Sequence, residues 1–199
     1  MIAILDVCSG NLRSVERALA HVGAEVMVTR DAETVRQADK IVVPGQGAFD
    51  VFMKGLAERA LGDVLRERIA AGVPYLGICL GLQVLFEHSE EGDCAGLGVL
   101  PGRVTRLVPG DRALKIPHMG WNPVAVKLPV PGIVDGSHVY FVHSYRVVPD
   151  DRSIVAFEAT HGVTFCAAIH HANLFACQFH PEKSQAVGLG MLRAFVEAA

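Results

Sequence analysis

The sequence predicts an α/β fold with three layers: an open mixed sheet, mostly parallel, with helices on both faces and antiparallel strands added in the second half. Two observations carry this prediction. In the first half, short apolar runs alternate with helix-period patterns, and this alternation is typical of parallel strands joined by helices. From Gly96 onward, Pro and Gly are frequent and the apolar runs are short, which favours antiparallel strands and hairpins.

The expected strands of the first half are short and mostly apolar, which is the pattern of parallel strands buried on both faces. They lie at residues 2–7, 25–29, 40–43 and 74–78. Pro44 and Gly45 are expected to end the third of these strands.

Helical spacing marks three segments between these strands. Apolar residues recur every three to four positions over 12–22, and Gly23 is a natural stop. A second helix is expected over 56–71, with Gly72 as its cap, and a third begins over 81–86.

The second half contributes six short strand candidates and one helix. The strands are expected at 103–107, 124–127, 138–142, 154–158, 164–169 and 174–178, attached to the first sheet. The helix is expected over 184–197. Because no repeat, low-complexity stretch or linker interrupts these elements, we expect a single domain over residues 1–199.

Composition excludes several functional classes. The chain has 18 Lys and Arg against 21 Asp and Glu, a formal net charge of −3, so a nucleic-acid binder with a broad basic field is not expected. No apolar run approaches the roughly 20 residues that a spanning helix needs, so no membrane association is expected. The segment Met1 to Asp6 lacks the basic start of a signal peptide.

The cysteines point to a reducing compartment. They number five, are widely spaced and form no Cys-x-x-Cys pair, which fits neither a disulfide framework nor a zinc site. We therefore expect a cytoplasmic protein with free thiols. His170 and His171 lack a spaced carboxylate or thiolate pattern, so they are interpreted as part of a hairpin loop rather than a metal site.

One cysteine stands in a pattern that favours catalysis. Cys79 lies between Gly77 and Gly81, after an apolar strand and before a helical segment, as in a nucleophile elbow. Such a sharp turn needs small neighbours, and a helix N-terminus favours a thiolate. The five-residue pattern also fits a buried cysteine at a tight turn.

A thiol nucleophile needs a base, and the base needs an orienting group. His180 follows an expected strand that Pro181 must end, and Glu182 is close enough in sequence to reach the same imidazole. A carboxylate there would fix the tautomer and stabilise the imidazolium. The alternative is a strand-end histidine followed by a helix-capping Glu.

Acyl transfer also needs donors for an oxyanion. Gly45, Gln46 and Gly47 follow the third strand, at the edge where open α/β sheets bind ligands, and their backbone can approach a substrate. The N–H of Leu80 is the second expected donor. The competing interpretation, a phosphate loop, fails because no Gly-x-Gly-x-x-Gly or Gly-Lys-Ser/Thr pattern is present.

With these three segments in order, the sequence resembles the class I (triad) glutamine amidotransferases. The motifs that carry the resemblance are PGQGAF at 44–49, GICLGLQ at 77–83 and QFHPEKSQ at 178–185. The resemblance implies a flavodoxin-like fold, with Cys79 as nucleophile, His180 as general base and acid and Glu182 as orienting carboxylate. It further implies hydrolysis of L-glutamine to glutamate and ammonia through a thioester, with no cofactor and no metal.

Within that family, three further motifs resemble the glutaminase subunits of imidazole glycerol phosphate synthase, in histidine biosynthesis. They are IPHMGWN at 116–122, YFVHSYR at 140–146 and GNLRSV at 10–15. The resemblance implies a heterodimer with a (β/α)8-barrel cyclase subunit. The partner would use channelled ammonia to make imidazole glycerol phosphate and an aminoimidazole carboxamide ribotide.

The resemblance also assigns further site residues. It places Gln83 and Glu91 near the substrate, with Glu91 at the far end of the elbow helix and facing the α-ammonium group. The pocket is expected to be lined by Gly47, His143, Ser144 and Tyr145, and the partner to be met by Met119, Trp121 and Lys183. Residue type alone also fits a solvated acid at Glu91, a strand histidine at His143 and a hydrophobic loop plug at Trp121.

Three other functions remain open on sequence. The first is another triad glutaminase, of the pyridoxal phosphate synthase or carbamoyl phosphate type. The second is a stand-alone cysteine hydrolase such as a γ-glutamyl hydrolase. The third is a non-catalytic binding subunit with an inactive triad, against which the intact Cys79, His180 and Glu182 argue. The turn at 6–11 departs from the family pattern, which puts local packing in doubt but not the triad.

Overall fold

The computed structural model describes residues 1–7, 12–111 and 113–198, and its largest element is an eight-stranded sheet. The strand order is β2-β1-β3-β4-β14-β13-β12-β9. The five parallel strands are β2 (Val26–Thr29), β1 (Ile2–Leu5), β3 (Lys40–Gly45), β4 (Tyr75–Cys79) and β14 (Leu174–Cys177). The antiparallel strands that follow are β13 (Val163–His171), β12 (Val155–His161) and β9 (Ala125–Val126).

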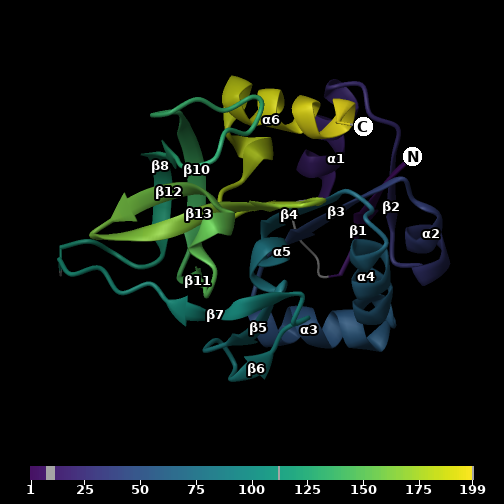
Figure 1. Ribbon diagram of the computed structural model, residues 1–199, viewed down its shortest axis with the longest axis horizontal. Helices are drawn as coiled ribbons and strands as arrows, with labels where there is room; N and C mark the ends of the chain where they lie inside the picture. Colours follow the sequence, from purple (N-terminus) through teal and green to yellow (C-terminus); the bar gives the residue numbers. More distant parts are fainter. Residues whose placement is uncertain (8–11, 112, 199) are drawn as a thin grey trace.

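Helices cover both faces of this sheet (Figure 1). On one face lie α1 (Leu12–His21) and α6 (Gln185–Glu197). On the other lie α2 (Ala32–Gln37), α3 (Phe49–Glu58) and α4 (Leu61–Ala70). Strand β1 shows why both faces are apolar: Ile2 and Ile4 belong to the core under α1 and α6, whereas Ala3 and Leu5 belong to the opposite core. The predicted fold class is confirmed.

Two smaller sheets stand apart from the main one, which corrects the expectation that all second-half strands join it. One is four-stranded, with β11 (Tyr145–Pro149), β7 (Leu100–Arg106), β5 (Phe86–Ser89) and β6 (Cys94–Ala95). The other pairs β8 (His118–Pro123) with β10 (His138–His143). Strands β5, β6, β8 and β11 were not expected. Gly, Pro or His residues weaken the strand pattern of β5, β8 and β11, and β6 is only two residues long.

The prediction of a single helix over 56–71 is wrong. The structure has two helices there, α3 beginning at Phe49 and α4 beginning at Leu61. They meet at Ala60, whose φ of 52° is left-handed and therefore incompatible with a continuous helix. Each helix has its own buried stripe, so helical spacing alone did not reveal the break. Helix α2, capped by the Asp31 side chain on the Thr34 N–H, was missed because it is only six residues long.

The helix expected over 81–86 is a single turn, α5 (Leu80–Gln83), and the chain then enters strand β5. Phe86 is fully buried and pairs with Leu100. The chain therefore continues as a strand at this point and not as a helix. Strand β3 likewise continues through Pro44 and Gly45, which pair with Ile78 and Cys79. The expected end of that strand was therefore two residues early.

The carboxyl ends of the parallel strands define where chemistry can occur. Strand β3 delivers residues 45–47, β4 delivers Cys79, and β14 is followed by His180 in the short 3-10 helix region η2 (Pro181–Lys183). Parallel neighbours end on the same edge of a sheet, so these segments meet there. A second 3-10 turn, η1 (Arg152–Ile154), precedes β12. Within the described part of the chain, no helix is both long and apolar enough to cross a membrane.

Candidate active site

The turn that carries Cys79 is strained and closely packed. Cys79 has φ 56° and ψ −105°, which is rare for a residue with a side chain. A Cβ on Gly81 would lie 1.8 Å from the Val43 carbonyl oxygen, and one on Gly77 would lie 2.4 Å from the Gly81 oxygen. Both flanking positions therefore need glycine, and the turn holds the thiol at the sheet edge above the start of α5.

His180 is fixed by an acid at one ring nitrogen. Its Nδ1 lies 2.8 Å from Glu182 Oε1, and the two side chains are only 2% and 1% exposed. A carboxylate only accepts hydrogen bonds, so Nδ1 carries the proton. The backbone is held too, because the His180 N–H donates to the Tyr140 carbonyl and the Ser184 hydroxyl donates to the His180 carbonyl. Nε2 is thereby directed away from Glu182.

The charge of His180 results from opposing effects. Burial alone lowers its pKa, but the interactions with Cys79 and Glu182 outweigh burial and raise the pKa to about 9. Nε2 makes no hydrogen bond of ordinary length to any described residue, yet lies near enough to Cys79 for the thiol to contribute to this shift. An imidazolium at neutral pH beside the Cys79 sulfur is a proton donor already in place.

Sequence reasoning missed one residue that touches the Cys79 sulfur. The Gln178 Nε2 amide lies 3.4 Å from Cys79 Sγ, and Gln178 is fully buried. Its Oε1 in turn accepts a 2.9 Å hydrogen bond from Gln83 Nε2. Gln178 opens the motif that contains His180, so its place in QFHPEKSQ was the available signal.

A cavity of ≈ 380 Å³ lies over the thiol. It is lined by Gln46, Gly47, Cys79, Leu80, Gln83, Glu91, Pro117, Val142, His143, Ser144, Tyr145, His180 and Lys183. Three of these residues were not expected in the pocket: Pro117, Val142 and Lys183, the last of which was expected to face the partner. Four anticipated residues do not line the cavity: Gly45, Met119, Trp121 and Glu182.

Gly45 and Gly47 serve different purposes at the end of β3. A Cβ on Gly45 would lie 2.5 Å from the Leu80 Cβ and 2.8 Å from the Phe52 ring, so Gly45 lets β3 and the elbow pack together. Gly47 has open space around it but a φ of +99°, a conformation that favours glycine. The structure thus brings Gln46 and Gly47, but not Gly45, to the cavity wall.

Glu91 reaches the cavity from a different element than expected. It lies in the turn between β5 and β6, not at the end of the elbow helix, because that helix stops at Gln83. Its Oε2 accepts a 3.0 Å hydrogen bond from the Phe49 N–H at the start of α3. Burial raises the pKa of Glu91, although the Phe49 hydrogen bond acts in the opposite direction.

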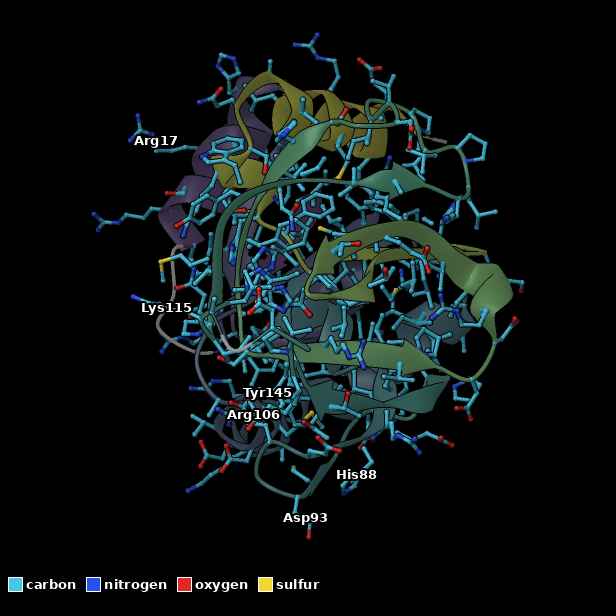
Figure 2. The ribbon with its side chains drawn as sticks, turned by 90° about the vertical axis from the view of Figure 1, so that its left-hand side faces the viewer. Arg17, His88, Asp93, Arg106, Lys115 and Tyr145 are labelled. Atoms are coloured by element: carbon cyan, nitrogen blue, oxygen red, sulfur yellow. The ribbon has the colours of Figure 1, made fainter. Side chains whose placement is uncertain are left out.

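The opposite wall of the cavity comes from the junction of β10 and β11. His143, Ser144 and Tyr145 all lie there, and the Leu107 N–H donates a 2.8 Å hydrogen bond to the Ser144 carbonyl. Figure 2 shows Tyr145 next to Arg106, its register partner on β7, and the Arg106 guanidinium lies 6.0 Å from the Tyr145 ring centre.

The family model of the class-I glutamine amidotransferases matches residues 3–198. The chain belongs to this family. It is 50% identical over 204 residues to the imidazole glycerol phosphate synthase subunit HisH of Syntrophotalea carbinolica, with 98% of each chain covered. It is 49% identical over 209 residues to the subunit of the same name from Aromatoleum aromaticum, covering 100% of this chain and 98% of the relative.

Solved structures of lower identity share the fold of this amidotransferase. A structure described as a glutamine amidotransferase has a TM-score of 0.74 at 22% identity, covering 94% of this chain and 93% of that one. PurLQS from Thermotoga maritima has a TM-score of 0.73 at 18% identity, covering 98% and 94%.

The amidotransferase presents an apolar surface beside its pocket. Met119 and Trp121 are 62% and 46% exposed, and both lie on β8 rather than in a loop, which corrects the expected setting of Trp121. Trp121 packs edge-on against Tyr140 of β10, and the Lys183 ammonium lies 5.7 Å above the same Tyr140 ring.

The other described cysteines and the pair His170 and His171 do not line the cavity. Among the described residues, Cys94, Cys166 and Cys177 are free thiols, as is Cys79. Cys8 and most of the first turn, including the start of the GNLRSV segment, lie outside the described residues. His170 and His171 end strand β13 beside a tight turn, and no group of three His, Cys, Asp or Glu side chains in the described part of the chain is arranged to hold a metal.

Proposed function

We propose that this chain is the glutaminase subunit of an imidazole glycerol phosphate synthase and that Cys79, His180 and Glu182 are its catalytic triad. The observation that supports the chemistry is a strained elbow cysteine with a carboxylate-bound imidazole beside it, under the cavity of ≈ 380 Å³. The named relatives at about half identity over their whole length support the choice of synthase.

The thiol performs nucleophilic acyl transfer on the side-chain amide of L-glutamine. The proton of Cys79 is held by His180 as the imidazolium, so Cys79 Sγ attacks the amide carbon as a thiolate. The tetrahedral intermediate then collapses as His180 Nε2 gives that proton to the amide nitrogen, which departs as ammonia. Water then attacks the γ-glutamyl thioester while His180 Nε2 takes its proton. Cleavage of the C–S bond releases glutamate and restores the Cys79 thiolate beside the protonated His180. Glu182 keeps Nδ1 protonated throughout, and the Gln178 amide stabilises negative charge on the sulfur.

The cavity supplies groups suited to glutamine. The backbone of residues 46–47 and the Leu80 N–H are proposed as donors to the oxyanion. The Gln83 Oε1 is buried and lacks a hydrogen-bond partner among the described residues, so a substrate donor would satisfy it. Glu91, on the far side, is proposed to meet the α-ammonium group.

The ammonia needs an acceptor that this chain does not provide, so we propose a heterodimer with a (β/α)8-barrel cyclase. Met119, Trp121 and Lys183 are proposed to face that partner, because two of them are exposed apolar side chains continuous with the cavity wall through Val142, which pairs with Met119. In the complex, ammonia would pass to the cyclase to form imidazole glycerol phosphate and an aminoimidazole carboxamide ribotide. Free thiols at all four described cysteines favour a cytoplasmic location for this one-domain subunit.

The deciding experiment is glutamate release by the purified chain, with and without the cyclase subunit and its nucleotide ligand. We expect low activity alone, strong stimulation in the complex, and a loss of several orders of magnitude in Cys79→Ala. High activity independent of the cyclase would favour a stand-alone hydrolase. Stimulation only by another synthase would favour a different triad glutaminase, and no activity in any complex would favour a non-catalytic subunit.

A further inference from the structure

A line of hydrogen bonds connects the exposed sheet β8–β10 to the cavity wall. Asn122 Nδ2 lies 3.2 Å from His118 Nε2, and His118 Nδ1 lies 2.9 Å from His143 Nε2. His143 Nδ1 lies 2.9 Å from the Tyr145 carbonyl oxygen. His118 and His143 are 4% and 5% exposed, so water does not replace these bonds.

The carbonyl at one end sets the direction of the whole line. Tyr145 O can only accept, so His143 Nδ1 donates and its Nε2 is left as an acceptor. His118 Nδ1 must then donate to that Nε2, and His118 Nε2 must accept from the Asn122 amide. The second Asn122 amide hydrogen goes to the Thr160 carbonyl at 2.8 Å, which fixes the amide orientation.

Both imidazoles are neutral in this arrangement. Burial lowers the pKa of His118 to about 4, with a smaller effect from the nearby His161. Burial lowers the pKa of His143 to about 3, although its bond to the Tyr145 carbonyl acts in the opposite direction. The other titratable groups that face the pair are His161, stacked 4.3 Å from His118, and His180.

The same carbonyl belongs to a second set of hydrogen bonds that ends at the nucleophile. Tyr145 O also accepts from Gln83 Nε2 at 3.2 Å, and Gln83 Nε2 donates to Gln178 Oε1. Gln178 in turn donates to Cys79 Sγ. The Tyr145 carbonyl therefore belongs to two chains of hydrogen bonds, one that leads to β8 and one that leads to the Cys79 thiol.

We infer that His118 is a positioning residue: by donating from Nδ1 to His143, it holds the Ser144–Tyr145 backbone in the place where the pocket binds its substrate. The inference rests on the proposed function, because that function supplies glutamine as the ligand of this wall. His118 shares β8 with the exposed Met119 and Trp121, but its side chain points to the opposite face of the strand from Met119.

The test compares two substitutions in the complex with the cyclase subunit. Asn places an amide donor near the position of the histidine Nδ1, whereas Leu fills the space without a donor. For His118→Leu we expect the KM for glutamine to rise about tenfold or more with kcat within about threefold, since the wall binds ground and transition states alike. For His118→Asn both constants should stay within about threefold of the parent.

A purely packing role for His118 predicts the reverse order. The His118 ring stacks on Phe141 at 4.9 Å, so Leu would preserve this apolar contact better than the short polar Asn. A Leu variant with parental KM, or an Asn variant as impaired as Leu, therefore overturns the inference. His161→Phe is the control: it keeps a ring against His118 but leaves the donor chain intact, and its kinetics should match the parent.

A direct measurement decides the case if either variant fails to fold. Long-range ¹H–¹⁵N correlation spectra of the labelled parent chain report which imidazole nitrogen is protonated. We expect the Nδ1–H tautomer for both His118 and His143, and an Nε2–H tautomer at His118 overturns the inference. If the parent complex releases no glutamate, the proposed function fails. If the parent is active and His118→Leu matches it, only the positioning role fails.

Discussion

At the scale of single residues, His180 shows how neighbours decide the charge of a buried group. Burial alone would leave the imidazole neutral, but Cys79 and Glu182 raise its pKa to about 9. The Glu182 carboxylate lies 2.8 Å from Nδ1, and both side chains are buried, so this contact is held in place. The residue is therefore protonated and held in one orientation before a substrate arrives, which suits the role of general acid proposed for it.

This charge makes stability depend on pH. The pKa of His180 is about 9 in the folded chain and roughly 6.5 in an unfolded one. The stabilising contribution is therefore fully present below pH 6.5 and is lost as the pH rises from 6.5 through 9. We expect the free energy of unfolding, measured in urea, to fall by about 1–3 kcal/mol more over this range in the parent than in His180→Gln.

The control for that series is His21→Gln. His21 is an exposed residue at the end of α1, so its replacement should leave the parental pH dependence unchanged. Equal pH dependence in the parent and in His180→Gln would contradict the assigned charge of His180.

Replacing Glu182 tests its proposed role in orienting His180. In Glu182→Gln, the amide can donate to Nδ1 and so favours the wrong tautomer, with the proton on Nε2. We expect kcat for glutamate release in the cyclase complex to fall about 10²–10⁴-fold, with little change in KM. Glu197→Gln, at the end of α6, is the matched control and should be neutral. Near-parental kcat in Glu182→Gln would remove Glu182 from the proposed triad.

At the scale of elements, the elbow depends on how closely β3, β4, α5 and β14 approach one another. Gly77 would collide with the Gly81 backbone and with Ala176 if it carried a side chain, and Gly81 would collide with the Val43 carbonyl. A similar approach occurs where α6 begins, because a Cβ on Gly188 would lie 1.9 Å from the Pro181 oxygen. The elements that hold Cys79 and His180 are thus joined through glycine contacts.

Gly81→Ala should therefore destabilise the fold. The added methyl would meet backbone rather than a mobile side chain, so we expect a loss of about 3 kcal/mol or more in the free energy of unfolding. Gly62→Ala is the matched control in α4, where the nearest atom would be 3.5 Å away and the helix gains from the substitution. That variant should be stabilised by about 0.4–1 kcal/mol. Comparable losses in both variants would show that packing at Gly81 is not special.

At the scale of the whole molecule, the sheet order separates the pocket from one edge. Met27 lies on β2, the first strand of the eight-stranded sheet, whereas β8 and β10 form a separate sheet whose strand β8 contacts β12, near the other end of that order. Figure 1 shows this arrangement, with β8 and β10 at the side of the molecule away from β2. Two exposed apolar side chains therefore occur in very different settings, Trp121 beside the cavity wall and Met27 remote from it.

This difference predicts selective effects on assembly. Trp121→Ala should weaken binding of the cyclase subunit at least tenfold, measured by calorimetry, while changing the free energy of unfolding of the isolated chain by less than about 0.5–1 kcal/mol. Met27→Ala removes an apolar side chain of similar exposure, 47% against 46%, and should leave the affinity unchanged. Equal effects of the two substitutions would place the partner elsewhere.

Features that depend on neighbouring residues were predicted from the sequence better than features that depend on residues far apart in the chain. The first β-α-β alternation and the Cys79 elbow depend on neighbours in sequence, so the strands at the start of the chain and the turn at 77–81 are predicted nearly correctly. The expectations failed at the break at Ala60, at the short α5 and at the strand at Phe86, whose pairing with Leu100 is not visible in the local pattern. Gln178 was overlooked for the same reason, because its contact with Cys79 spans 99 residues.

The sequence by itself determined the fold class, the family and the three motifs that carry the proposed triad, since glycines at a turn and Pro after a histidine act locally. Only the tertiary structure decided which side chains meet. It put Glu91 on a β5–β6 turn, gave Gly45 a packing position rather than a place in the cavity, and linked His118 to the Tyr145 carbonyl through His143. The physical reason is that hydrogen-bond direction and burial depend on segments that only folding brings together.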